Sequence, residues 1–193
     1  VASNPNHERA QYNLGLVYQR QGRLPEAVKH YRLALSLKDD DPETRNNLAV
    51  ALMALGDTDE AMRQYKRVIE LEPDSWQAWH NLGKAHQQLG QLEAAQACYE
   101  RVLTIDADHW PTHVQLGALH RARGQYDASL HHYRRSVTLA PRQPDPHVDL
   151  GVTLAILGRL DEAAVHFNNA LALNPKAGHA WFNLGLIHEQ RGH

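Results

Sequence analysis

The chain of 193 residues has one cysteine, Cys98, and little net charge. A single cysteine cannot form a disulfide within the chain, so the fold needs no oxidising compartment. The formal net charge of −2 argues against a nucleic-acid-binding protein, which normally has a basic face. No apolar run approaches the roughly 20 residues of a membrane-spanning helix. We therefore expect no binding of nucleic acid and no insertion into a membrane.

The sequence also lacks the motifs of catalysis. It contains no nucleophile motif, phosphate-binding loop or paired-carboxylate signature. Its 14 histidines have no recognised ligand spacing, and zinc needs three or four converging ligands. His131 and His132 are adjacent and so point to different faces of a helix. We predict that the chain is not an enzyme, holds no metal and needs no cofactor.

Residues 1–6 lack the basic and apolar regions of a secretory signal peptide. This predicts a cytoplasmic location. A periplasmic location stays open if a signal peptide has been removed.

What the sequence does contain is a strict period of 34 residues. A long period in a chain without low-complexity tracts is typical of stacked repeat proteins. We number each repeat so that its leucine is at position 7 and its glycine at position 15. The leucines are Leu14, Leu48, Leu82, Leu116, Leu150 and Leu184, and the glycines are Gly22, Gly56, Gly90, Gly124, Gly158 and Gly192.

This numbering predicts a single array over residues 1–193. Its parts are the tail of a preceding repeat (1–7), five complete repeats (8–41, 42–75, 76–109, 110–143 and 144–177) and a partial sixth repeat or capping helix (178–193). The two ends suggest a segment of a longer array. The alternative is an array that a lone helix caps.

Each repeat contains two stripes at helical spacing, which predicts two amphipathic helices. The first stripe lies at positions 4, 7, 8 and 11, and the second at positions 20, 24 and 27. Small residues at positions 8 and 20 would let the two helices approach closely. The glycine at position 15 suits a left-handed residue that ends the first helix.

These positions identify the chain as similar to the tetratricopeptide repeat family, with an aromatic residue at position 4, Leu-Gly at 7–8, Ala at 20, Tyr or Phe at 24 and Pro at 32. The resemblance implies an all-α fold, an α-solenoid in which antiparallel helical hairpins form a right-handed superhelix. It also implies that the first helices line a concave groove. The departures are Gln11, Arg45, His113 and His147 at position 4, Ser129 at position 20, and Asp39 and Ala107 at position 32.

The face of each first helix opposite its core stripe contains positions 2, 6, 9 and 13, with positions 5 and 12 beside them. Position 6 is always an amide or a carboxylate, and amide side chains can hold a peptide backbone of any sequence. This asparagine ladder resembles the groove of the repeat domain in O-linked N-acetylglucosamine transferases. The alternative is that these residues only solvate a helix face.

We predict that this face binds a peptide, with Lys84 and Arg121 selecting acidic groups and Val148, Val152 and Phe182 selecting apolar ones. The predicted peptide-binding residues are Tyr12, Asn13, Leu16, Asn46, Asn47, Val50, His80, Asn81, Lys84, Gln87, Val114, Gln115, Ala118, Arg121, Val148, Asp149, Val152, Phe182 and Asn183. The Lys, Asn and Arg pattern by which related repeats clamp the acidic terminus of heat-shock chaperones is absent.

The predicted function is a protein-protein interaction scaffold that binds a protein or peptide segment in the groove. One alternative is the substrate-recruiting arm of a larger enzyme, such as a glycosyltransferase. The other is a self-assembling structural array. We also expect self-association through the C-terminal helix, where Trp181, Leu184 and Ile187 would be short of cover.

Overall fold

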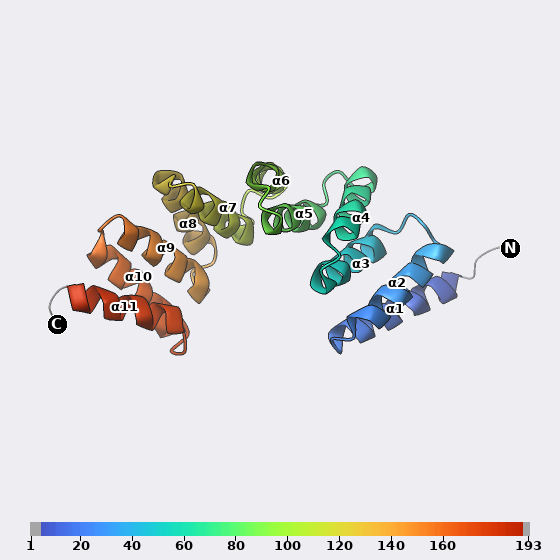
Figure 1. Ribbon diagram of the computed structural model, residues 1–193, viewed down its shortest axis with the longest axis horizontal. Helices are drawn as coiled ribbons and strands as arrows, with labels where there is room; N and C mark the ends of the chain where they lie inside the picture. The colour runs from blue at the N-terminus through green and yellow to red at the C-terminus, as the bar shows by residue number, and fades with distance from the viewer. Residues whose placement is uncertain (1–4, 191–193) are drawn as a thin grey trace. The chain divides into compact units, whose positions relative to one another are not determined.

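The computed structural model describes residues 5–190, and within that range the chain forms eleven α-helices and no strand (Figure 1). The predicted all-α class is therefore confirmed. The helices are α1 (Pro5–Arg20), α2 (Leu24–Leu37), α3 (Pro42–Leu55), α4 (Thr58–Leu71), α5 (Trp76–Gln88), α6 (Leu92–Ile105), α7 (Trp110–Ala122), α8 (Tyr126–Leu139), α9 (Pro144–Ile156), α10 (Leu160–Leu173) and α11 (Gly178–Gln190).

The helices form two compact units, Val1–Ile105 with α1–α6 and Asp106–His193 with α7–α11. Within each unit, every odd-numbered helix that has a following helix packs against it as a hairpin. Each even-numbered helix also contacts the first helix of the next hairpin in its unit. Each unit has its own cluster of buried apolar residues. The hairpin is therefore the packing element of both units.

The glycines at position 15 end the first helices in a left-handed conformation, as predicted. Gly22, Gly56, Gly90, Gly124 and Gly158 have φ angles from 71° to 85°. At Gly56 the next amide, that of Asp57, donates to the carbonyl of Leu52, and the Gly56 amide donates to Met53. This pair of bonds satisfies carbonyls that the helix end would otherwise leave open. Gly192 lies outside the described residues.

The glycine at position 8 forms a notch that receives the aromatic ring at position 24 of the same hairpin. A Cβ atom added to Gly15 would lie 2.5 Å from the Tyr31 ring. The corresponding pairs are Gly83 with Tyr99, Gly117 with Tyr133, and Gly151 with Phe167. All four rings are fully buried. The prediction that small residues allow close helix approach is confirmed at these pairs.

A second buried stripe, at positions 3, 7 and 10, was not predicted. In α11 it consists of Ala180, Leu184 and Ile187, all at most 6% exposed, on a helix that contacts α9 and α10. Leu184 and Ile187 are thus covered, which corrects the expectation that they are not. In α1 the same stripe faces no other helix among the described residues, so Leu14 is 41% exposed and is not a core residue.

Position 4 anchors the start of each of four first helices to the preceding loop. The N–H group of the side chain there donates a hydrogen bond to the backbone carbonyl of position 32 in the preceding repeat. Both tryptophan and histidine make this bond. The bonds join Trp79 to Pro73 (2.9 Å), His113 to Ala107 (3.1 Å), His147 to Pro141 (3.3 Å) and Trp181 to Pro175 (3.0 Å). The histidine departures from the family pattern therefore keep the anchoring bond.

The histidines at position 4 form a second bond across the hairpin, to position 23. The Nδ1 atoms of His113 and His132 are 3.0 Å apart, and those of His147 and His166 are 3.1 Å apart. When the Nε2–H of a neutral His113 donates to the Ala107 carbonyl, its Nδ1 accepts a hydrogen bond from the Nδ1–H of His132. We call these two contacts the histidine pairs.

Candidate functional site

The predicted groove residues lie on the first helices of both units, and all but one have exposed surface. Asn13, Lys84 and Phe182 are exposed. Tyr12 alone is buried. The remainder are half-buried: Leu16, Asn46, Asn47, Val50, His80, Asn81, Gln87, Val114, Gln115, Ala118, Arg121, Val148, Asp149, Val152 and Asn183.

Tyr12 supports the groove from beneath instead of lining it. Its side chain is 4% exposed, and its ring centroid lies 6.1 Å from that of Tyr31. Its hydroxyl donates to Glu43 Oε1 at 2.6 Å and accepts from Asn47 Nδ2 at 3.1 Å. The sequence placed Tyr12 among the contact residues because position 5 flanks the groove face. The helix wheel could not show that this ring fills the core of the hairpin.

Asn47 and Asn81 are held in one orientation by bonds to the preceding first helix. Asn47 Nδ2 donates to Tyr12, and Asn81 Nδ2 donates to Asn46 Oδ1 at 3.5 Å. These bonds use the amide N–H groups and leave the Oδ1 atoms as acceptors. The ladder does not continue unchanged in the second unit, where Asn183 Nδ2 instead donates to the carbonyl of His179 at 2.7 Å.

Arg121 is not available to select acidic groups, which corrects the prediction. Its Nη2 lies 3.1 Å from Asp149 Oδ1, and its Nη1 donates to the Asp149 carbonyl at 3.2 Å. Its guanidinium also lies over the ring of Tyr133, 5.3 Å from the centroid. Lys84, in contrast, is exposed and has no bonding partner among residues 5–190. Of the two cations predicted to select acidic groups, only Lys84 has an unpaired side chain.

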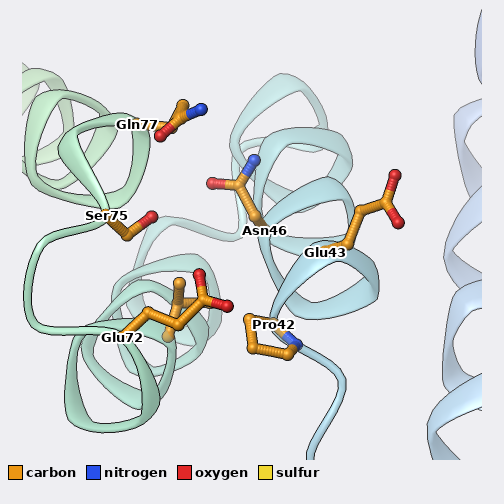
Figure 2. A pocket seen from close by; sticks show the side chains of 7 residues that line it. Pro42, Glu43, Asn46, Glu72, Ser75 and Gln77 are labelled. Carbon is orange, nitrogen blue, oxygen red and sulfur yellow. The ribbon is translucent and has the colours of Figure 1, made fainter.

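A polar pocket of about 200 Å³ lies where α3, α4 and α5 meet (Figure 2). We call it the α3–α5 pocket. Figure 2 shows the Glu72 carboxylate and the Asn46 amide directed toward the space beside Ser75, whereas the Glu43 carboxylate is directed away. Glu43 is already bonded to Tyr12, so Glu72 supplies the carboxylate of the pocket. The lining residues are Pro42, Glu43, Asn46, Val68, Glu72, Ser75 and Gln77.

The second unit has a pocket of about 450 Å³ that α7, α9, α11 and the loop between α10 and α11 line. We call it the α9–α11 pocket. It uses the same repeat positions as the α3–α5 pocket, namely 2, 5, 31 and 34 of one repeat and 2 of the next. Valine and alanine replace asparagine and serine at two of them, so its wall is more apolar. The lining residues are Val114, Asp145, Val148, Asp149, Asn174, Ala177 and His179.

A third pocket, of about 210 Å³, lies farther along α3 and α5. Asn81 and Lys84 line it together with apolar side chains of α3 and the ring of Tyr65. It therefore combines an amide, a free ammonium group and an apolar floor. The lining residues are Val50, Met53, Ala54, Tyr65, Asn81, Lys84 and Gln88.

Sequence reasoning missed the residues that the second helices and loops give to these pockets. Glu72 and Ser75 belong to the end of one repeat, and Asn174 and Ala177 are their equivalents. Ser75 is at the N-cap of α5, but its side chain makes no capping bond. A wheel of the first helix contains none of these residues. Their shared repeat positions, 31 and 34, are the signal that could have found them.

Among residues 5–190, no three His, Cys, Asp or Glu side chains come together as metal ligands. Over the same range no helix is both long and apolar enough to cross a membrane. His86, at position 11 of the predicted first stripe, is half-buried and bonds through Nδ1 to Gln91 Oε1 at 2.6 Å in the turn that follows.

Four family models match the chain in overlapping segments. Three, each described as tetratricopeptide repeat, match residues 6–74, 52–119 and 114–169. The fourth, described as TPR repeat, matches residues 153–192. No curated protein sequence matches the chain.

Solved structures with the same fold include MamA from Desulfovibrio magneticus RS-1, with a TM-score of 0.79 and 21% identity over 92% of this chain and 99% of that one. TTC0263 from Thermus thermophilus has a TM-score of 0.72 and 22% identity, over 93% and 98% of the two chains. YrrB, described as a TPR protein with an unusual peptide-binding site, has a TM-score of 0.69 and 17% identity over 89% of each. At these identities the likeness concerns the fold. With the family models spanning residues 6–192, the chain belongs to the tetratricopeptide repeat family.

Proposed function

We propose that this protein is an interaction scaffold whose first helices bind an extended peptide segment of a partner protein. Tetratricopeptide repeat proteins bind proteins or peptides, and YrrB is described as having a peptide-binding site. The observation that carries the proposal is the fixed orientation of Asn47 and Asn81. Each side-chain amide donates a hydrogen bond to a neighbouring helix, and its carbonyl oxygen is left to accept one from a ligand.

A carbonyl acceptor of this kind suits the backbone N–H of a peptide, because every residue except proline has one. Successive first helices in a packed array lie about 8–10 Å apart. An extended chain advances about 3.3 Å per residue, so Asn47 and Asn81 would hold N–H groups about three residues apart. Backbone contacts of this type give affinity without specifying the peptide sequence.

The pockets supply the specificity of the proposed site. The side-chain carboxylate of Glu72 has no bonding partner among residues 5–190, so the α3–α5 pocket favours a basic side chain of the peptide. Lys84, in the next pocket, favours an acidic one. In the second unit, the α9–α11 pocket, with Val114, Val148 and Ala177, favours an apolar side chain of a segment bound to that unit.

The test begins with peptides selected from a random library on the purified chain. Their affinities are then measured by calorimetry for the wild type and for the Asn47→Ala, Asn81→Ala double variant. We expect binding to weaken by about 1–3 kcal/mol, the range for hydrogen bonds lost at a desolvated contact. Stability should fall by no more than about 1 kcal/mol, because the lost internal bonds are partly exposed.

The matched control is Asn168→Ala, the same substitution at an exposed asparagine on the second helix α10. This control should leave both affinity and stability unchanged. Affinity that ignores the double variant but falls with Asn168→Ala would place the binding surface on the second helices instead.

A further inference from the structure

Helix α11 carries a glycine notch that no ring of the described residues fills. At Gly15, Gly83, Gly117 and Gly151 an added Cβ would meet an aromatic ring within 3 Å. At Gly185, which has the same repeat position, an added Cβ would meet nothing within 4 Å. The notch that receives an aromatic ring in four hairpins is thus open in α11.

The open notch lies in an exposed apolar face. Trp181, Phe182 and Leu186 are 58%, 65% and 41% exposed, whereas the opposite side of α11 is buried against α9 and α10. Trp181 is also held in place, because its Nε1 donates to the Pro175 carbonyl as Trp79 does to Pro73. A fixed face with several large apolar side chains marks a contact surface for another molecule.

The sequence of α11 also contains the pattern that fills such notches. In α2 and α10 the inserted ring lies between two alanines, four residues before it and three after it. These are Ala27, Tyr31 and Ala34 in α2, and Ala163, Phe167 and Ala170 in α10, each at most 1% exposed. In α11, Phe182 lies between Gly178 and Gly185 at the same spacing. The ring of α11 that best matches the pattern is therefore the most exposed of its large apolar side chains.

We propose that two copies of this chain associate through α11, with Phe182 of each copy in the Gly185 notch of the other. Residues three apart lie on one helix face, so one face presents both ring and notch. When two copies of α11 pack antiparallel about a two-fold axis, the ring of each copy fills the notch of the other. Two-fold symmetry is the usual symmetry of a dimer. Trp181 and Leu186 border the contact and lose exposed surface. This proposal does not depend on the Asn47 and Asn81 contacts that carry the peptide-binding proposal.

The experiment is sedimentation velocity of the whole chain over a concentration range of about 5–500 μM, since dimerisation follows mass action. We expect a concentration-dependent dimer for the wild type. Two variants probe the two halves of the contact. Phe182→Asp removes the ring, and Gly185→Leu fills the notch on an exposed helical surface where the chain itself has room. Each should weaken dimerisation by about tenfold or more, as expected for a central aromatic contact.

Val165→Asp is the matched control, because Val165 is 58% exposed, close to the 65% of Phe182, but lies on α10. It should leave dimerisation unchanged, and circular dichroism should show that all three variants remain folded. A chain that stays monomeric throughout the range overturns the proposal. So does a dimer that Phe182→Asp weakens but Gly185→Leu does not, because the notch would then be irrelevant.

A further arm distinguishes another occupant of the same face. A synthetic peptide of residues 160–173, the sequence of α10, is added to the chain over the same concentration range. Competition between this peptide and dimerisation would support the proposed use of the notch. Peptide binding to a chain that never dimerises would show that the face takes a hairpin-completing helix, and would overturn the proposal of a second copy.

Discussion

The α3–α5 pocket and the α9–α11 pocket use the same repeat positions but have different chemistry. Position 31 is Glu72 in the first and Asn174 in the second, and position 34 is Ser75 and Ala177. In both pockets the shared positions lie on two successive first helices and in the loop before the second of them. The comparison teaches that the repeat sets where a pocket forms, while a few side chains at the repeat boundary set what it accepts.

The two units differ in the same way at positions 4 and 23. The second unit has the histidine pairs, whereas the first has Trp79 with Cys98, Arg45 bonded to Gln64, and Gln11 bonded to His30. One anchoring position therefore accepts residues with very different titration behaviour. The predictions that follow use these differences to separate the two units.

The largest effect is expected from removing a central leucine of each unit. Leu48 and Leu116 occupy position 7 and are each 1% exposed. Replacing either with alanine should cost about 2–5 kcal/mol, the range for a buried leucine. Because stability in repeat proteins is local, hydrogen exchange should rise mainly in the unit that carries the substitution. Equal loss of protection in both units would show that they unfold as one.

The next effect is a loss of stability in acid that comes from buried histidines of the second unit. Burial lowers the pKa of His132 to about 4, with a further contribution from His113, and burial also lowers the pKa of His113 and of His166. In the unfolded chain these groups titrate near 6.5. Between about pH 6.5 and pH 4 the unfolded state therefore binds more protons, and stability falls as the pH falls. We expect a loss on the order of 1–3 kcal/mol between about pH 7 and pH 4.5.

The measurement is denaturant unfolding as a function of pH, with hydrogen exchange to locate the loss. The matched variant grafts the pair found in the first unit onto the second, as His113→Trp with His132→Cys. This variant should keep the anchoring bond to Ala107 and lose much of the pH dependence. If the pH dependence of stability were unchanged in the grafted chain, the pair of His113 and His132 would not be its cause.

The smallest effect is an exchange of specificity between the two pockets, and it rests on the proposed function. Glu72→Asn should weaken peptides with a basic side chain at this site by roughly three- to tenfold, since partly exposed ion pairs contribute about 1 kcal/mol. Asn174→Glu should strengthen binding of the same peptides to the second unit. Calorimetry of both variants, with Glu70→Gln on the exposed side of α4 as control, measures the exchange. A basic preference that survives Glu72→Asn would assign it to other residues.

Most of the fold was readable from the sequence because the period repeats the same packing many times. The glycines at position 15 and the small residues at position 8 have the predicted roles, and position 24 lies in the buried stripe predicted for the second helix. A helical wheel of one hairpin could not show that positions 3 and 10 are buried, because these positions contact a neighbouring hairpin. That contact depends on how hairpins stack, which the stripes within one repeat do not specify.

The candidate site was less predictable for a related reason. Tyr12 and Arg121 are on the expected face, but each is bonded to a residue 28 to 35 positions away. Periodicity identifies the face of a helix and does not show which of its side chains bond to one another. Glu72 and Asn174 lie outside the first helices altogether, so only the assembled hairpins bring them to the site.

The bond from position 4 to the loop carbonyl has a consequence for how such repeats tolerate change. The requirement there is a flat side chain with an N–H group six residues after the carbonyl, and both indole and imidazole meet it. Phenylalanine, closer to tryptophan in hydrophobicity, has no N–H to donate. A substitution scale based on hydrophobicity would therefore misjudge this position. An engineer who exchanges tryptophan for histidine there would keep the architecture and add acid sensitivity to a chosen hairpin.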